Sequence, residues 1–552
     1  MFARLGAPGS ALCMVAGLLV TGLSGAAPAT AAAQVSGPAA AQVTPVRSPA
    51  SPSTRRPRAA ASPAPSPTTW SSMTPRPRIT KPLPTRRPLP RRPTASPTPP
   101  TGFVYRSGRD LMLDGDPYHF VGFNAFGMTG CATNEPWTRA ELDAYFEGLP
   151  PASMTRTWAF ASFGVDELDL IVERAHENKQ KLILSLANQG TDCGEIAKDE
   201  AWYQGGYQGA YWAWVDKVVK RYKNSDAIGM WEIINEPGHK TTGVTTDMIK
   251  QFLDATAKYI KDRDPFHLVE SGTMAEFTEG TGNATNFGLL HDGPHIDVGS
   301  LHEYDQDHSD QVISRHLAPT LSQLHKLEKP IIVGETGIVA GPGCPITTAQ
   351  RSAMFKKEFD GYFQSGVSGV MIWTYSPNPR TKPEDACMHQ VRAPDPDPAI
   401  AMVRGYTRPA AVPAPTGERQ LQLLGTGNCV QAPGTANGTV AGTTTCSTTA
   451  TDQRFTLRPT TDGFVRLVAK NSGKCLGVGD LDVTLRALVV QSDCAAEADG
   501  AGRQFRLEPA ADGYYRIIFR HSNQCLTLNP TAKLQQFDCK TPTLTSQQWK
   551  IK

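Results

Sequence analysis

The sequence predicts an α/β protein with a (β/α)8 barrel, the TIM-barrel architecture, followed by an all-β domain built from three repeats. Two observations predict the barrel. Between about residues 118 and 407, eight short β-rich runs alternate with amphipathic helical stretches. Almost every run is apolar at its start and polar or aromatic at its end, as expected if all the ends meet at one barrel mouth. Three similar cysteine-containing units between residues 419 and 552 predict the second domain.

An open, doubly wound sheet has a similar rhythm of strands and helices and is the alternative fold. The barrel is favoured because polar groups scattered by chance would not sit in phase at so many run ends, and about 290 residues suits this fold. The eight runs are HFVGFNAF (119–126), MTRTWAF (154–160), KLILSLAN (181–188), IGMWEIINE (228–236), HLVESGT (267–273), VGSLHEY (298–304), PIIVGETG (330–337) and VSGVMIWTY (367–375).

Upstream of the barrel, the chain predicts a secretory signal peptide at residues 1–33 and a disordered Pro/Arg-rich linker at 34–101. The apolar stretch 11–23 follows Arg4, is too short to span a bilayer, and precedes small residues that offer cleavage sites. The linker has no Asp or Glu and cannot bury enough apolar surface to fold. Its basic residues could contact nucleic acid or an anionic surface. A plain spacer is the preferred interpretation, and we expect a secreted, extracellular protein without nucleic acid or membrane attachment.

Eleven cysteines are present, and only Cys13 lies in the predicted signal peptide. The other ten are an even number in an exported chain and show no CxxC spacing, so disulfides are predicted rather than a zinc site. The four barrel cysteines permit three connectivities. We favour Cys131–Cys193 and Cys344–Cys387, because each pair joins loops that are close around the mouth. Within-repeat bonds are the simplest pairing for the others: Cys429–Cys446, Cys475–Cys494 and Cys525–Cys539.

Two glutamates stand out at the run ends. Glu236 ends the fourth run, in MWEIINEP (230–237), and Glu335 ends the seventh. A lone glutamate would more often be a helix cap or a solvated loop acid. Two carboxyls across a barrel mouth, however, are the groups needed for glycoside hydrolysis: one protonates the leaving oxygen and the other attacks the anomeric carbon. Arg156, which ends the second run, could keep the attacking carboxylate ionised. Glu232, in mid-strand, is expected to hydrogen-bond inside the barrel in a structural role.

Aromatic residues near the mouth allow two interpretations each, since sugar faces and protein cores both suit aromatic rings. Trp158 and Phe160 could stack on sugars or cap the core. Trp202 and Tyr203 could line the cleft, whereas residues 212 and 214 (both Trp) are expected to pack the following helix. His239, just after the NEP segment, could contact substrate.

The motifs WEIINEP (231–237) and VGETG (333–337) resemble the acid/base and nucleophile motifs of the retaining (β/α)8 glycoside hydrolases of clan A. The best likeness is to glycoside hydrolase family 5. Within this family, TRTWAF (155–160) and LILSLAN (182–188) look most like the endo-β-1,4-mannanases. The resemblance covers roughly residues 118–380, and only the combination of motifs makes it specific.

This resemblance implies a secreted retaining endo-β-1,4-mannanase that hydrolyses plant mannans by a two-glutamate double displacement, with no cofactor and no metal. It implies Glu236 as general acid/base and Glu335 as nucleophile. It also implies that Asn235 binds the sugar 2-hydroxyl and that Arg156 hydrogen-bonds the nucleophile. The remaining roles it implies are a His-x-Tyr pair of His302 and Tyr304, with Tyr304 touching Glu335, and a sugar platform at Trp373. Trp158 is a further candidate substrate-binding residue because of its place at a run end.

Two other functions remain open on the sequence. The first is an endo-β-1,4-glucanase or another family 5 β-glycanase, although SLANQ at the third run lacks the His of many members and is closer to the mannanase form. The second is a non-catalytic carbohydrate-binding protein, against which the complete set of site residues argues. In either enzyme reading, the partner is a polysaccharide, whether mannan, glucomannan or another β-glycan, and the protein is a monomer.

The C-terminal units each have a first cysteine after a turn (GTGNCVQA, NSGKCLGV, HSNQCLTL), a second cysteine and an aromatic closing run. Repeats this short must share a core, most simply around a threefold axis. They resemble the ricin B-type β-trefoil lectin, which also serves as a carbohydrate-binding module. Where that family often has an Asp two positions after the first cysteine, this chain has Gln431, Gly477 and Thr527, so sugar binding and a spacer role both remain open. The expected domain limits are 102–408 for the barrel, 409–418 for a linker and 419–552 for the trefoil.

Overall fold

The computed structural model describes residues 99–131, 135–238, 243–274, 284–304, 317–378, 387–393, 397–409, 415–460, 463–494, 501–540 and 543–552. The predicted signal peptide and all but the last residues of the predicted N-terminal linker lie outside these ranges, as does His239. Among the described residues, none of the helices combines the length and the apolar character needed to cross a bilayer.

Eight parallel strands form the barrel in the order β8-β7-β6-β5-β4-β11-β10-β9. The two ends of this order meet, because Met274, four residues after the end of β8, pairs in parallel with His302 of β9. The predicted barrel is therefore confirmed, and each strand falls within one of the eight predicted runs. The strands are β4 (Phe120–Asn124), β5 (Met154–Trp158), β6 (Lys181–Ser185), β7 (Ile228–Glu232), β8 (Leu268–Glu270), β9 (Gly299–Glu303), β10 (Ile331–Thr336) and β11 (Gly369–Ile372).

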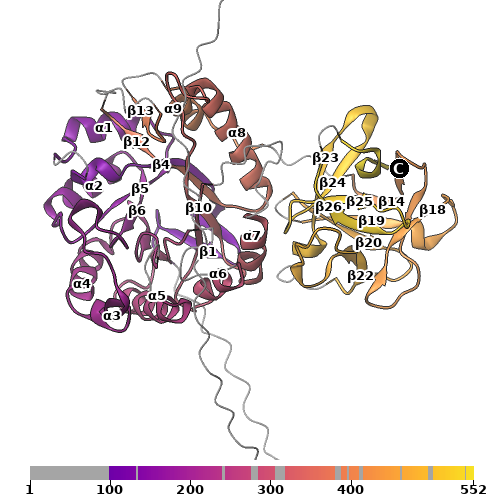
Figure 1. Cartoon of the computed structure of the whole chain (residues 1–552), viewed down its shortest axis with the longest axis horizontal. Helices are drawn as coiled ribbons and strands as arrows, with labels where there is room; N and C mark the ends of the chain where they lie inside the picture. The colour runs from indigo at the N-terminus through magenta and orange to yellow at the C-terminus, as the bar shows by residue number, and fades with distance from the viewer. Residues whose placement is uncertain are drawn as a thin grey trace, which may run out of the picture. The chain divides into compact units, whose positions relative to one another are not determined.

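Helices surround the strands (Figure 1). They bury one apolar stripe each against the outer faces of the strands; α5, for example, buries Ile249, Phe252, Leu253 and Ile260. Thr138 and Thr347 cap α1 and α8 with reciprocal capping boxes, which fixes where these helices begin. The helices are α1 (Arg139–Glu147), α2 (Asp166–Glu177), α3 (Glu200–Tyr203), α4 (Ala210–Tyr222), α5 (Thr246–Lys261), α6 (Ala284–His291), α7 (Leu317–Lys326), α8 (Thr348–Gln364) and α9 (Pro398–Arg404).

An N-terminal antiparallel sheet closes the amino end of the barrel. It consists of β1 (Val104–Ser107), β2 (Asp110–Leu113) and β3 (Asp116–Pro117). Val104 and Leu111 of this sheet pack in one buried cluster with inward-facing barrel residues such as Met230 and Met371. This apolar cluster fills the barrel interior at the amino end of the strands. The polar side chains of the interior therefore lie at the carboxyl end of the strands. Beyond β11, a short parallel pair joins β12 (Tyr375–Ser376) and β13 (Val391–Arg392).

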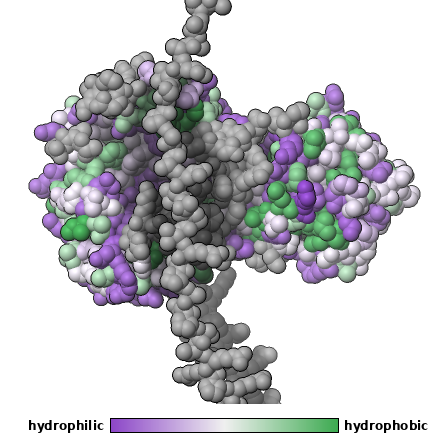
Figure 2. Space-filling view, viewed as in Figure 1, coloured by the Kyte–Doolittle hydropathy of each residue, from purple (hydrophilic) through white to green (hydrophobic). Residues whose placement is uncertain are grey.

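The C-terminal region is all-β and has its own core, which supports the predicted trefoil fold. Leu421, Phe455, Phe505 and Trp549 lie in one buried cluster, while its visible surface mixes hydrophilic and hydrophobic residues (Figure 2). The strands are β14 (Gly417–Arg419), β15 (Leu421–Leu423), β16 (Cys429–Gln431), β17 (Thr439–Val440), β18 (Gly442–Thr444), β19 (Phe455–Pro459), β20 (Val465–Ala469), β21 (Cys475–Gly477), β22 (Val490–Ser492), β23 (Phe505–Pro509), β24 (Tyr515–Phe519), β25 (Cys525–Leu528), β26 (Leu534–Phe537) and β27 (Trp549–Ile551).

The ten cysteines pair as the sequence predicted. Cys131–Cys193 and Cys344–Cys387 connect loops at the barrel mouth. In the trefoil, each repeat has one internal disulfide between neighbouring strands or their flanking turns: Cys429–Cys446, Cys475–Cys494 and Cys525–Cys539. Strand β14 begins at Gly417, inside the segment expected to be a linker.

Candidate active site

A pocket of about 720 Å³ opens at the carboxyl end of the barrel strands. Most of its lining comes from strand ends and from the loops that follow them, which is where catalytic residues lie in this fold. Among the residues predicted for the site, six line the pocket, whereas Arg156 and His302 lie buried beneath it. The lining consists of Phe126, Cys131, Trp158, Asn188, Asp192, Cys193, Asn235, Glu236, Met274, Tyr304, Glu335, Trp373 and His389.

Glu335 is the last residue but one of β10 and is 3% exposed. Its Oε1 accepts a hydrogen bond from Nη1 of Arg156 at 2.5 Å, and its Oε2 accepts one from the hydroxyl of Tyr304 at 2.5 Å. Burial raises the pKa of Glu335 above the usual value for a glutamate, and the charges of His302 and Arg156 oppose this rise. These donors hold the carboxylate in a fixed orientation toward the pocket.

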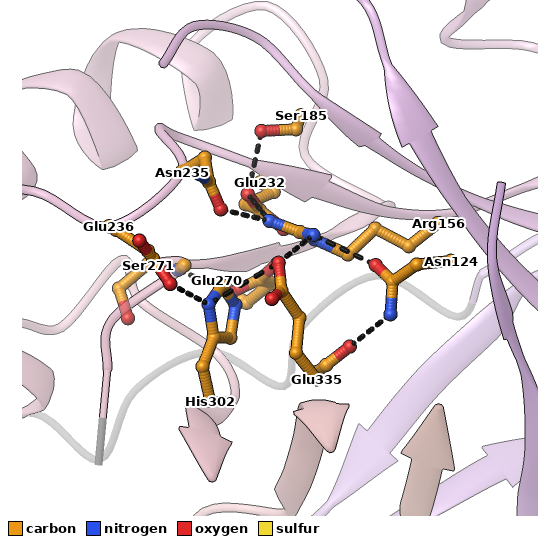
Figure 3. Close-up of polar contacts among 12 residues, drawn as sticks. Asn124, Arg156, Ser185, Glu232, Asn235, Glu236, Glu270, Ser271, His302 and Glu335 are labelled. Carbon is orange, nitrogen blue, oxygen red and sulfur yellow. Dashed lines mark hydrogen bonds and ion pairs between the residues drawn. The ribbon is translucent and has the colours of Figure 1, made fainter. Parts of the chain in front are cut away.

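Glu236 comes four residues after the end of β7 and is more accessible, with 19% of its side chain exposed. Its backbone lies in the left-handed region, with a φ of 50°, which is uncommon for a residue other than glycine. Its Oε1 is 3.1 Å from Nδ1 of His302, and the same nitrogen is 3.4 Å from Oε1 of Glu335. One imidazole nitrogen therefore contacts both carboxylates, and the two glutamates face the same space (Figure 3).

Arg156 lies at the centre of the polar network beneath the pocket (Figure 3). Besides Glu335, it binds Glu232 through two hydrogen bonds, one of them from Nη2 at 2.6 Å. It also donates to the side-chain oxygens of Asn124 at 2.8 Å and Asn235 at 2.7 Å. A guanidinium suits this position because it offers five donors in a fixed plane. Its predicted hydrogen bond to Glu335 is confirmed, although Arg156 lies in the middle of β5 and not at its end.

Glu232 hydrogen-bonds inside the barrel, as predicted. It was expected in mid-strand, but β7 ends at this residue, and its carboxylate reaches Arg156 from inside the barrel. It also accepts a hydrogen bond from the hydroxyl of Ser185 at 2.6 Å. Burial alone would raise its pKa, but the charge and hydrogen bonds of Arg156 lower it to about 2. Glu232 is thus a buried carboxylate that orients the guanidinium toward Glu335.

Asn235 and Asn124 complete the hydrogen bonding around the arginine. The side-chain nitrogen of Asn235 donates to Asn188 at 2.9 Å, so its carbonyl oxygen is turned toward Arg156. Asn124 donates to the backbone oxygen of Gly334 at 2.9 Å, which ties the first strand of the barrel to the seventh.

Aromatic rings form one wall of the pocket. Trp373 stacks on Phe126 with ring centroids 5.0 Å apart, and Trp158 lies 5.7 Å from Trp373. Of the two residues with open roles, Trp158 lines the pocket, whereas Phe160 is fully buried behind it and caps the core. The two residues differ in their position in the run: Trp158 is the last residue of β5 and its ring reaches the pocket, whereas Phe160, two residues later, does not.

The prediction that Trp202 and Tyr203 line the cleft is wrong. Trp202 packs against Phe252 of α5 at 4.8 Å, outside the pocket lining. Tyr203 is 2% exposed, and its hydroxyl hydrogen-bonds Gln189 and the backbone N–H of Gly238, just after the NEP segment. The predicted packing of the two following tryptophans is confirmed: Trp212 stacks on Tyr259, and Trp214 donates to the backbone oxygen of Ala159.

His389 lines the pocket and was not predicted as a site residue. Its ring stacks on Tyr304 with centroids 5.4 Å apart, so it packs behind the donor to Glu335. Its loop is held by Arg351 of α8, which is fully buried, donates to the carbonyls of Met388 and His389 at 2.9 and 3.1 Å, and is paired with Asp397. Only the folded loop brings these residues together.

Among the described residues, one group of three donor side chains could hold a metal ion: Glu236, His302 and Glu335, whose ligand atoms all lie within 4.8 Å of one another. The same closeness suits proton transfer and nucleophilic attack by paired carboxylates.

Comparison with known protein families gives a family for the barrel and for the C-terminal domain. Residues 143–379 match the family described as cellulase (glycosyl hydrolase family 5), and residues 418–552 match the ricin-type beta-trefoil lectin domain. The chain carries a family 5 glycosyl hydrolase domain and a C-terminal ricin-type lectin domain. Both resemblances noted in the sequence are thereby confirmed.

Curated relatives of the family 5 domain are named as mannanases. The probable mannan endo-1,4-beta-mannosidase F of Neosartorya fischeri is 27% identical over 254 residues, covering 38% of this chain and 55% of that protein. Mannan endo-1,4-beta-mannosidase 8 of Oryza sativa is 28% identical over 341 residues, covering 49% of this chain and 90% of the relative. This chain spans 55%, 58% and 66% of the length of three such relatives.

Among solved structures, the endo-1,4-beta-mannanase of Rhizomucor miehei is similar, with 22% identity, a TM-score of 0.45, and coverage of 55% of this chain and 97% of that one. The barrel assignment itself rests on the strand order and closure of this chain.

Proposed function

We propose that this protein is a secreted, retaining endo-β-1,4-mannanase whose polysaccharide substrate binds in the pocket at the carboxyl end of the barrel. The observation that carries the proposal is the pairing of Glu236 and Glu335 across His302, with donor atoms within 4.8 Å. Retaining glycosidases place their two carboxyls about 5–5.5 Å apart, so that one attacks the sugar directly, whereas inverting enzymes leave room for a water.

In this mechanism, Glu335 attacks the anomeric carbon while Glu236 protonates the leaving oxygen, and a covalent glycosyl-enzyme forms. Glu236 then removes a proton from the water that hydrolyses this intermediate. The burial of Glu335 and its bonds to Arg156 and Tyr304 suit a nucleophile that must be held in place, and the more exposed Glu236 suits proton exchange with solvent. Asn235, at the edge of the same network, binds the sugar 2-hydroxyl.

Mannan as substrate is supported by the names of the curated relatives and by the sequence of the third strand end. The family description also includes cellulases, so an endo-β-1,4-glucanase is the second candidate. A reducing-sugar assay on mannan, glucomannan, carboxymethylcellulose and laminarin separates the two. Fast hydrolysis of mannan with none of carboxymethylcellulose is expected, and the reverse order would replace mannan by glucan in the proposal.

The stereochemistry of the product tests the mechanism. Proton NMR during the first minutes of manno-oligosaccharide hydrolysis should show the β-anomer of the new reducing end before mutarotation. Initial release of the α-anomer would exclude attack by Glu335 on the sugar, because a single displacement by water inverts the anomeric centre.

The C-terminal domain is proposed to bind carbohydrate and to keep the catalytic domain near insoluble substrate. Its ricin-type lectin family supports this role. The five disulfides agree with a protein exported to an oxidising environment, which supports secretion. We also propose that the enzyme is a monomer.

Replacing Trp373 by Ala should weaken substrate binding, because this ring forms the exposed wall of the pocket and suits the apolar face of a sugar. We expect KM for manno-oligosaccharides to rise roughly fivefold, equivalent to about 1 kcal/mol, with a smaller effect on kcat. Steady-state kinetics measure both parameters. Trp212→Ala is the matched control, since Trp212 packs against Tyr259 away from the pocket; an equal rise in KM in both variants would contradict the platform role.

A further inference from the structure

Glu270 is a buried carboxyl that the roles above do not use. It is the last residue of β8, is 1% exposed, and lies beneath the pocket beside Glu232 (Figure 3). Its Oε2 accepts a hydrogen bond from the backbone N–H of Gly272 at 2.7 Å. Within the part of the chain that the structure describes, its Oε1 accepts no hydrogen bond from an N–H or O–H donor, and the carboxyl lies within hydrogen-bonding reach of the Glu232 carboxyl. A buried carboxyl in this position requires a physical explanation.

Gly272, whose N–H is bound by Glu270, also binds Glu236 through its carbonyl group. The carbonyl of Gly272 accepts a hydrogen bond from the backbone N–H of Glu236 at 2.8 Å. Gly272 has a φ of 71°, and a Cβ at this residue would lie 2.1 Å from the carbonyl oxygen of Ile234, so only glycine fits. Since Glu236 itself adopts a left-handed backbone, its conformation depends on such restraints. A continuous path therefore runs from the Glu270 carboxyl through Gly272 to the Glu236 backbone.

The charges around Glu270 decide its protonation. The carboxylates of Glu232 and Glu335 already share the single positive charge of Arg156. A third buried anion would have no cation of its own, because Arg156 is the cation whose charge acts on Glu270, and His302 of β9 contacts Glu236 and Glu335 instead. Burial first, and then the adjacent Glu232 carboxylate, raise the pKa of Glu270 well above its usual value.

We propose that Glu270 is a positioning residue that fixes the acid/base Glu236 through the backbone of Gly272, and that it does so as a neutral carboxylic acid. Oε2 accepts from Gly272, and the proton sits on Oε1. In this form the acid orients the Glu236 backbone without drawing the charge of Arg156 away from Glu335. The kinetic part of this inference rests on the proposed function, whereas the protonation of Glu270 does not.

The first test measures protonation without any activity. Folded protein keeps a proton on Glu270 that unfolded protein releases above the usual glutamate pKa, so stability falls as pH rises. The unfolding constant of the wild type, relative to that of Glu270→Gln, should rise about tenfold for each pH unit between about pH 5 and 7. Urea unfolding of the full chain, followed by tryptophan fluorescence, measures this ratio. A ratio independent of pH would show that Glu270 is ionised in the fold and would overturn the proposal.

The second test measures positioning. Glu270→Gln keeps a neutral acceptor for Gly272 and should retain kcat, whereas Glu270→Leu removes the acceptor and should lower kcat on manno-oligosaccharides by about 10²-fold. The loss should shrink on a dinitrophenyl β-mannobioside, because this leaving group departs without a proton from Glu236. Ser271→Ala is the control at the next residue of the chain: it loses a hydrogen bond to His291 but should keep kcat.

The outcomes separate the inference from the proposed function. A wild type that hydrolyses none of the polysaccharides refutes the proposed function, and the pH dependence of unfolding still decides the protonation of Glu270. If Glu270→Leu loses equal activity on both leaving groups, or keeps full activity, Glu270 does not position Glu236. If Glu270→Leu does not fold, Glu270→Gln decides the positioning role. Loss of kcat in Glu270→Gln would overturn this role. Retention of kcat would show that a neutral acceptor for the Gly272 N–H is sufficient to position Glu236.

Discussion

Replacement of Glu335 by Gln should lower kcat on manno-oligosaccharides by on the order of 10⁴- to 10⁶-fold, the range seen when the nucleophile of a covalent mechanism is removed. Gln has nearly the same shape, and its one carbonyl oxygen can still accept the hydrogen bond from Arg156, while its amide nitrogen takes the place of the oxygen that accepts from Tyr304; in the native site each donor contacts Glu335 at 2.5 Å. It carries no negative charge with which to attack the anomeric carbon. Steady-state kinetics with a thermal unfolding control measure the loss in a folded protein.

Glu303→Gln is the matched control for this variant. Glu303 is the last residue of β9 and is 3% exposed, so it is also a buried glutamate at a strand end, yet it does not line the pocket. Its replacement should leave kcat within a few-fold of the wild type. A comparable collapse in both variants would mean that burial of a strand-end charge, and not nucleophilic attack, explains the effect.

Azide distinguishes the roles proposed for Glu335 and Glu236. In Glu335→Ala, azide can enter the space left by the side chain and attack an activated substrate from the same side as the lost carboxylate, giving an α-glycosyl azide. In Glu236→Ala, the glycosyl-enzyme still forms from an activated substrate, and azide attacks it from the opposite side, giving the β-azide. Product NMR reads the configuration, and exchanged configurations would reverse the two roles.

Replacement of Arg156 by Met should destabilise the protein by about 3–5 kcal/mol at neutral pH, the cost of removing one partner of a buried ion pair. The variant leaves Glu232, fully buried, and Glu335 without their cation. It should also lower kcat, because the nucleophile loses a donor and the partner that orients it. Urea unfolding and steady-state kinetics measure the two effects.

The pH dependence of this destabilisation has a definite sign. In the wild type, Arg156 lowers the pKa of Glu232 from its usual 4.5 to about 2. A lowered carboxyl pKa contributes stability above the unfolded value of 4.5, and this contribution is lost as pH falls toward 2. The difference in unfolding free energy between wild type and Arg156→Met should therefore be largest at neutral pH and decrease below pH 4.5. A difference that is constant with pH would contradict the ionised pair.

Arg174→Met is the control for loss of an arginine ion pair. Arg174 of α2 binds Asp143, which is 26% exposed, near the surface of the barrel. Surface pairs contribute about 0–1 kcal/mol, so this variant should unfold nearly as the wild type does at every pH and should keep its activity.

Much of the fold was predictable because strands and their ends carry a strong local signal. The apolar starts of the eight runs and the polar ends mark both the barrel and its mouth, and Glu236, Glu335, His302 and Tyr304 followed from that pattern. The cysteine pairing followed from chain order, because barrel loops that follow nearby strands meet at the same end, and because each repeat closes on itself.

The rest depended on contacts that the sequence does not encode locally. Trp202 and Tyr203 were misplaced because an aromatic cluster looks the same whether it lines a cleft or packs a helix such as α5. His389 reaches the pocket only because Arg351 folds its loop from a distant helix. No role could be predicted for Glu270 from the sequence. A single acid in a short apolar run does not indicate a function, and its contact with Glu232 is made only in the fold.

The backbone of Glu236 has a broader consequence. A left-handed conformation at a non-glycine residue costs on the order of 1–3 kcal/mol, and glycine or asparagine would accept it more readily. Neither of them carries a carboxyl. At this one residue, stability and chemistry therefore favour different amino acids, so a search for thermostable variants that ignores activity would drift toward an inert barrel. Stabilisation of this enzyme is better sought in surfaces and loops remote from the mouth.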